Sequence, residues 1–243
     1  MDRLGYTAMT AASRTMTSLQ VRANNLANVN TPGFRADLEQ AKAVDVQGYG
    51  YDSRHMALAK SNGVSLAPGA LMATGRDLDF AIQGKGLIAL EGADGKEVYT
   101  RHGSVQVDAE LRLTVNGRPV LGEGGPIVLP EYDSLHIGSD GVVSVMPRGD
   151  YLMVEVDRIK RVDVPASDLV KDASGLLRTK DGQPAEASEE VALVSGYLEA
   201  SNVSAIEQLV GTMSLNRLFE TQVKMMKAAE DLSDAGNRMI RGS

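Results

Sequence analysis

The chain has 243 residues and a formal net charge of −7, with no cysteine and an aromatic content of 4%. This length suits one large domain or two modest ones, and the acidic balance argues against a nucleic-acid-binding protein. Without cysteine, disulfides and thiolate metal sites are excluded, and no apolar run approaches the roughly 20 residues that span a bilayer, so membrane insertion is not expected.

The first expected element is a long amphipathic helix at the N-terminus. Its apolar positions alternate in steps of three and four, the a/d seam of a coiled coil: Met9, Ala12, Met16, Leu19, Ala23 and Leu26. The helix runs into asparagines and then into Pro32-Gly33, which cannot continue it. We expect Gly33 to take a positive φ and Phe34 to anchor the turn. Because the first thirty residues lack a continuous apolar core, no cleaved secretory signal is expected.

The middle of the chain favours β structure. Short apolar runs are expected to form strands at 78–82, 87–90, 104–108, 111–115, 127–129, 134–137, 142–146 and 152–156. Asp94-Gly95, Asn116-Gly117 and Asp140-Gly141 are dipeptides that hairpin turns favour. The pattern predicts a compact, mostly antiparallel β domain over residues 78–156. The flanking segments, 35–77 and 157–200, are rich in Gly, Ser, Ala and charge, and we expect them to run as extended connectors.

The last expected element is a second long helix. Ser204 followed by Glu207 matches a capping box, and the helical pattern continues to about Ile240. A seven-residue apolar repeat runs along it: Leu218, Met225, Leu232 and Met239. Upstream, Ile206, Leu209 and Met213 form a stripe in a slightly different register. Neither long helix can bury its stripe on a small domain alone, so we expect the two to pair with each other and with neighbouring molecules.

The predicted fold is therefore α+β. An N-terminal helix (1–34) and a C-terminal helix (201–243) pair as a coiled-coil-like stem, joined through two extended connectors to a central antiparallel β domain. The alternative is that both helices simply pack in one ordinary bundle.

No catalytic, cofactor or metal site is expected. The three histidines, His55, His102 and His136, lack a second ligand at metal spacing. Gly84-Lys85-Gly86 lacks the phosphate-loop frame and predicts a tight turn. Acidic pairs among Asp77, Asp79 and Asp108 are expected by chance in so acidic a chain. Asn202-Val203-Ser204 matches a glycosylation triplet but suits a helix cap better.

Four ordered segments resemble the bacterial flagellar rod and hook protein family. The first contains the motif residues Asn24, Asn25, Leu26, Ala27, Asn28, Pro32, Gly33 and Phe34. The second and third, residues 78–86 and 99–105, resemble the entry to the family's β domain and its next hairpin. His102 is a departure there, because the family usually has Asp. The fourth, residues 196–203, resembles the start of the C-terminal helix.

The resemblance implies a structural subunit of the basal body rod, without a cofactor. It implies export through the flagellar type III apparatus and polymerisation in the periplasm into a helical tube with other rod proteins, the terminal helices lining the channel. Short length and a compact region after Phe34 favour a proximal rod subunit. A distal rod or hook subunit is the nearest alternative, and a cell-wall hydrolase is a distant one.

Overall fold

A computed structural model of the chain describes residues 2–45, 55–172 and 174–242. The chain forms two compact units. We call the first the helical unit, which comprises residues 1–27, 37–61 and 204–243. The second, the β unit, comprises residues 28–36 and 62–203. The α+β class predicted from the sequence is confirmed.

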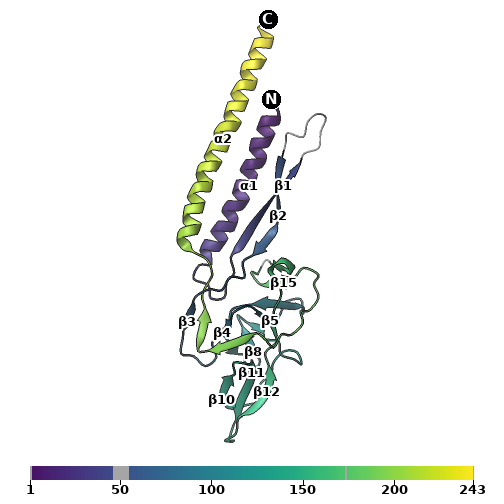
Figure 1. Ribbon diagram of the computed structural model, residues 1–243, viewed down its shortest axis with the longest axis vertical. Coiled ribbons are helices and arrows are strands. Elements are labelled where there is room, and N and C mark those ends of the chain that lie inside the picture. Colours follow the sequence, from purple (N-terminus) through teal and green to yellow (C-terminus); the bar gives the residue numbers. More distant parts are fainter. Residues whose placement is uncertain (1, 46–54, 173, 243) are drawn as a thin grey trace. The chain divides into compact units, whose positions relative to one another are not determined.

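The helical unit contains two long helices and a strand pair. Helix α1 spans Asp2–Ala27 and helix α2 spans Ala205–Arg241. They lie side by side (Figure 1), and the Thr15 hydroxyl donates to Oε1 of Gln222 at 3.1 Å. Strand β1 (Asp37–Asp45) pairs with β2 (His55–Val64).

Short sequence signals mark the start of α2 and the region in which α1 ends. The side chain of Ser204 caps α2 by accepting from the backbone N–H of Glu207 at 3.4 Å, as the capping pattern predicted. Helix α1 ends at Ala27, shortly after Asn24 and Asn25 and before Pro32, so it is shorter than the expected range of 1–34.

The β unit contains the remaining strands and a short 3₁₀ helix. The strands are β3 (Leu71–Ala73), β4 (Phe80–Gln83), β5 (Leu87–Glu91), β6 (Glu97–Thr100), β7 (Gln106–Val107), β8 (Leu113–Val115), β9 (Arg118–Pro119), β10 (Tyr132–Ile137), β11 (Val142–Pro147), β12 (Val154–Arg158), β13 (Arg161–Val162), β14 (Leu169–Lys171), β15 (Leu177–Thr179), β16 (Ala192–Ser195) and β17 (Tyr197–Glu199). The 3₁₀ helix is η1 (Ala166–Asp168).

These strands form small antiparallel sheets. The largest has the order β13-β5-β6-β15-β14, two have three strands, β10-β11-β12 and β7-β8-β9, and two have two strands, β16-β4 and β17-β3. A main cluster of buried side chains, which includes Phe80, Ile88, Leu113 and Val143, forms the core of the unit. Burial of such apolar surface is what stabilises this unit.

Several sequence expectations need correction. The structure has no strand at 127–129, where a single isolated bridge joins Val128 to Arg112, and it adds β6 and β9. The segments expected to be connectors contain strands, β1 to β3 in the first and β13 to β17 in the second. In the second segment, β13 pairs with β5, β15 with β6, β16 with β4 and β17 with β3. All four partners are far away in the sequence, as in the Leu198–Met72 pair. Such pairing depends on partners that a local pattern cannot reveal.

Candidate functional site

The buried side chains at the contact between the two helices are small or polar. Ala8, Ala12 and Thr15 are buried on α1, and Gln208, Gln222 and Ala229 are buried on α2. A Cβ built on Gly211 would lie 2.3 Å from Nη1 of Arg22, so this glycine admits the arginine side chain. Small residues allow the two backbones to approach closely, and Leu or Met at these positions would hold them apart.

The predicted seam residues divide between this face and the surface. On α1, Ala12 is buried and Leu19 and Leu26 are half-buried, whereas Met9, Met16 and Ala23 are exposed. On α2 all four residues of the seven-residue repeat are exposed: Leu218 (48%), Met225 (45%), Leu232 (59%) and Met239 (75%). The larger apolar side chains therefore flank the contact between α1 and α2 instead of filling it.

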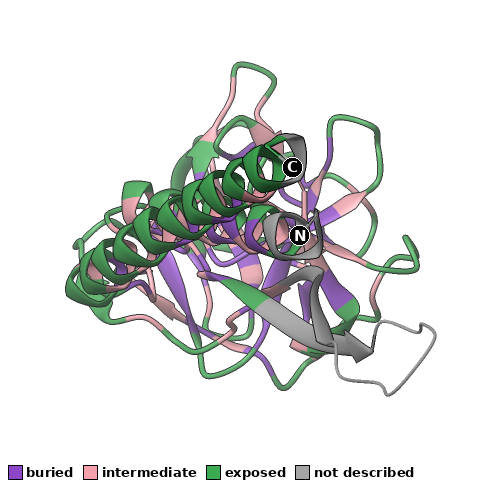
Figure 2. Ribbon diagram, turned by 90° about the horizontal axis from the view of Figure 1, so that it is seen from above, coloured by how far each residue is buried: buried purple, intermediate pink, exposed green. Residues whose placement is uncertain are grey.

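The surface of α2 is apolar at its beginning as well. Ile206, Leu209 and Met213 are exposed, at 75%, 50% and 59%. Figure 2 shows α2 coloured as exposed over most of its length. A row of exposed large apolar side chains of this kind marks an interaction surface.

Two asparagines of the N-terminal motif attach α1 to the strand pair. The side chain of the buried Asn25 donates to the carbonyl of Asp37 at 3.0 Å and accepts from its N–H at 2.8 Å. Asn24 donates to the Asp37 carboxylate at 3.0 Å. The sequence suggested only that asparagines help to end the helix. The structure shows that their amides also satisfy the first backbone groups of β1.

The rest of the motif forms a turn in the β unit. Gly33 has a φ of 70°, as expected, and its N–H donates to the carbonyl of Glu199 at 2.7 Å. A Cβ on Gly33 would lie 2.3 Å from the backbone nitrogen of His102. The carbonyl of Pro32 lies 2.9 Å from Nδ1 of His102. The turn therefore needs glycine for its backbone angle and for its close approach to another segment.

Phe34 and Lys171 hold the turn from the other side. Nζ of Lys171 lies 3.9 Å from the centroid of the Phe34 ring, which is a cation–π contact. The same ammonium donates to the carbonyl of Arg35 at 2.6 Å. The structure thus supports the expectation that Phe34 anchors the turn, and it identifies the partner, which the sequence did not indicate.

A buried charge cluster joins three of the motif segments. Oε1 of Glu199 lies 2.5 Å from Nη2 of Arg35 and 3.0 Å from Nη1 of Arg101, and all three side chains are at most 2% exposed. Arg101 also donates to the carbonyls of Gly84 and Gly86. Burial lowers the pKa of both guanidinium groups, and the Glu199 carboxylate opposes that shift.

Asn202 makes a second set of polar contacts in the β unit, with Ala36, Ser65 and Ala67. Its Oδ1 accepts from the N–H of Ala36 at 2.8 Å, and its Nδ2 donates to the carbonyls of Ser65 at 3.0 Å and Ala67 at 2.9 Å. Sequence reasoning missed this role, and it missed the charge cluster too. The available signal was that charged and amide side chains lie inside the segments that resemble the family.

The weak enzymatic alternatives have structural explanations. Asp79 pairs with Arg76 at 3.3 Å, and Asp108 pairs with Arg112 at 2.8 Å. Gly84 and Gly86 both have positive φ in a turn between strands. Within residues 2–45, 55–172 and 174–242, no group of three His, Asp or Glu side chains could hold a metal ion, and no helix is long and apolar enough to cross a membrane.

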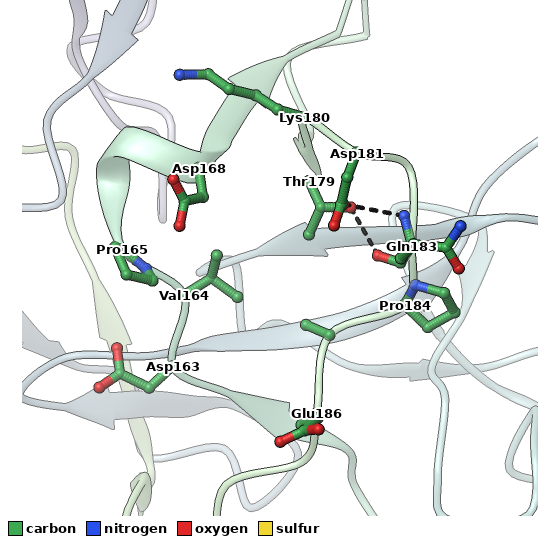
Figure 3. Close-up of a pocket in the computed structure, with 11 residues that line it drawn as sticks. Asp163, Val164, Pro165, Asp168, Thr179, Lys180, Asp181, Gln183, Pro184 and Glu186 are labelled. Atoms are coloured by element: carbon green, nitrogen blue, oxygen red, sulfur yellow. Dashed lines mark hydrogen bonds between the residues drawn. The ribbon is translucent and has the colours of Figure 1, made fainter.

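One open pocket of about 480 Å³ lies beside η1 and β15 (Figure 3). Its lining includes Asp163, Asp168, Asp181 and Glu186, with Lys180 at one side. The Asp181 carboxylate accepts a hydrogen bond from the N–H of Gln183 at 3.1 Å, which is a contact within its own loop. No nucleophile, base and orienting group converge there, so the exposed apolar surface of the helices is the better candidate for function.

Family profiles match the chain in three places. Residues 6–35 match the flagella basal body rod protein family, and residues 81–145 match the flagellar hook protein FlgE/F/G D1 domain. Residues 194–239 match the C-terminal domain of the flagellar basal body rod FlgEFG proteins.

Relatives that align with nearly the whole chain point to the same family as the profiles. The chain is 38% identical to the flagellar basal-body rod protein FlgF of Escherichia coli K12, over 99% of both chains. It is also 38% identical to FlgF of Salmonella typhimurium LT2, over 99% of both chains. The flagellar basal-body rod protein FlgG of Bacillus subtilis 168 is 30% identical, over 96% of this chain and 97% of its own.

Proposed function

Because this chain belongs to the flagellar basal-body rod protein family, and is therefore a structural protein of the rod and not an enzyme, we propose that it polymerises into the proximal rod through the apolar surface of its two long helices. The observation that carries the proposal is the row of exposed leucine and methionine side chains on α2, which the pairing with α1 leaves uncovered. The assembly interface comprises the outward residues of the predicted seams, Met9, Met16, Ala23, Leu218, Met225, Leu232 and Met239. Ala12, Leu19 and Leu26 hold the two helices together as a coiled-coil-like stem.

The apolar row supports assembly on energetic grounds. Full burial of an exposed large apolar side chain contributes about 1.5–3 kcal/mol. The side chains of this row are 45–75% exposed, so each covered residue contributes part of that amount, and several together offset the cost of association. The contact between α1 and α2 is small and polar by comparison. The helices are thus held loosely by each other and more strongly by their neighbours.

The remaining elements of the proposal concern delivery and partners. Other rod proteins are the expected neighbours in the basal body. Export through the flagellar type III apparatus without a cleaved signal peptide, followed by assembly in the periplasm, suits a chain that has no cysteine to oxidise there. The chain is more similar to FlgF of Escherichia coli than to FlgG of Bacillus subtilis, which supports the proximal position over a distal one.

Leu232→Asp tests the proposal. Leu232 is 59% exposed, so the purified variant should unfold at the same denaturant concentration as the wild type. In a rod the variant would bury an unpaired carboxylate at a cost of several kcal/mol, and rods and motility should be lost. Asn237→Asp is the control, because Asn237 is also exposed on α2 and is itself polar. Normal rods from the Leu232 variant would contradict the assigned interface.

A further inference from the structure

Two apolar clusters of the β unit lie outside the helices and are exposed. The first comprises Leu71 and Met72 on β3 and Tyr197 on β17, at 50%, 43% and 38% exposure. The second is a run of four consecutive residues that leads into β12: Tyr151 (95%), Leu152 (72%), Met153 (48%) and Val154 (47%). In Figure 1, β3 and β12 lie well apart within this unit, so the two clusters do not cover each other.

Strand β3 presents an open edge. Among the residues that the structure describes, it has a strand neighbour on one side only, where Leu198 pairs with Met72. The far edge of β17 is used differently, since its Glu199 carbonyl accepts from the N–H of Gly33 at 2.7 Å. All three residues of β3 are exposed, and the sequence from residue 61 to 75 contains no ionisable side chain. Proteins normally protect such an edge with a lysine, a charge or a covering segment.

The open edge is also held in a fixed conformation. The Glu199 carboxylate accepts from the N–H of Gly69 at 2.7 Å, and the side chain of Asn202 donates to the carbonyls of Ser65 and Ala67. The far end of the strand is fixed too, because the N–H of Thr74 donates to the carbonyl of Gly196 at 2.9 Å. A strand with fixed backbone, bare edge and apolar side chains is preorganised to accept another extended segment.

The exposed run 151–154 is also apolar and lies beside an open strand edge. Within the described part of the chain, Val154 begins an edge strand, β12, that pairs only with β11, and the three residues before it lie outside this strand. The segment is uncharged, and so is the sequence from residue 61 to 75 that contains β3. Apolar residues of the segment would therefore meet apolar residues of β3.

We propose that the 151–154 segment of a second copy of this chain pairs along the open edge of β3. The inference rests on the proposed function, since it supplies a second contact between rod subunits. The two surfaces are different patches of the same subunit, so the contact is head-to-tail and generates an open helical array instead of a closed dimer. Main-chain hydrogen bonds supply the attachment, and the alternating side chains supply the register.

Cysteine cross-linking tests the proposal cleanly, because the chain has no cysteine of its own. Two differently tagged copies, one with Met72→Cys and one with Leu152→Cys, are expressed together in the source bacterium after deletion of its own gene. In isolated basal bodies, mild oxidation should give a disulfide-linked species that carries both tags. The control pairs Met72→Cys with Ala109→Cys, an exposed residue between β7 and β8, and should give none. Linkage between two Met72→Cys copies would overturn the head-to-tail arrangement.

A photoreactive phenylalanine analogue in place of Tyr151 provides a second measurement that does not depend on disulfide geometry. After irradiation of basal bodies, the adduct should map to residues 67–76 of another copy. An adduct on a different protein, or elsewhere on this chain, would overturn the proposal. If the subunit is present in rods but neither linkage forms, this inference fails and the proposed function stands. If the subunit is absent from rods, the proposed function itself fails.

Discussion

A Cβ atom on Gly33 would lie 2.3 Å from the backbone nitrogen of His102, a separation that real side chains do not adopt. The atoms that would be struck belong to the backbone of a buried segment, so they cannot move aside as a flexible side chain could. The motif turn and the loop between β6 and β7, which contains His102, therefore constrain each other.

Gly33→Val is expected to destabilise the β unit and to prevent rod assembly. A β-branched residue at a φ of 70° costs about 1–3 kcal/mol, and the clash with His102 adds to that. The denaturation midpoint of the purified chain and the presence of rods in basal bodies are the measurements. Gly182→Val is a matched control, because Gly182 also has a φ of 70° but no atom lies within 4 Å of its Cβ position. Equal losses in the two variants would show that the contact with His102 is unimportant.

Glu199→Gln should destabilise the chain strongly. The substitution leaves an acceptor for the N–H of Gly69 but removes the negative charge between two buried guanidinium groups. Removal of one partner from a buried ion pair costs about 3–5 kcal/mol. Chemical unfolding measures the loss. Glu189→Gln is the control, since Glu189 is 91% exposed and lies 3.8 Å from Arg158, and a change of no more than about 1 kcal/mol is expected there. Similar midpoints for both variants would contradict the role given to Glu199.

The terminal helices of the isolated subunit should exchange amide hydrogens faster than the β unit. Among the described residues of α1 and α2, the buried apolar side chains are only alanines: Ala8, Ala12 and Ala229. In contrast, the core of the β unit buries Phe80, Ile88 and Leu113. Regions with little buried apolar surface open at low free energy. Hydrogen exchange of the monomer at low concentration tests this, and equal protection of α1 and β5 would mean that the helix pair is stable without neighbours.

Tyr99 should ionise late in an alkaline titration. Burial, together with the hydrogen bond to Glu97 at 2.9 Å, raises the pKa of its phenol to about 12 against the opposing effect of the N–H of Ala185. Because the folded pKa lies above the unfolded value of about 10, Tyr99 contributes stability that is fully present below pH 10. That stability is lost as the pH rises towards 12. Tyrosinate absorbance should show a late phase that Tyr99→Phe removes, and persistence of the phase in the variant would assign it to another tyrosine.

The sequence by itself determined the elements whose signals are local. The Ser204 cap and the positive φ of Gly33 were predicted because each depends on a few consecutive residues, whereas α1 ends at Ala27, before the Pro32-Gly33 pair that was expected to stop it. The hairpin at Asn116-Gly117 followed from the same kind of signal, and both residues have positive φ. The four motif segments indicated the family for a related reason, since their order along the chain is itself sequence information.

Only the tertiary structure decided which side of each helix is covered and which distant segments meet. Met16 and Leu232 lie in apolar repeats that any single-helix argument assigns to the contact, yet both are exposed because smaller neighbours permit a closer approach. Arg35, Arg101 and Glu199 meet across long stretches of chain, and β17 finds its partner in β3. Pairings of this kind depend on shape and on electrostatic balance within the folded core. A local pattern records neither of them, so the charge cluster and the open edge of β3 emerge only from the structure.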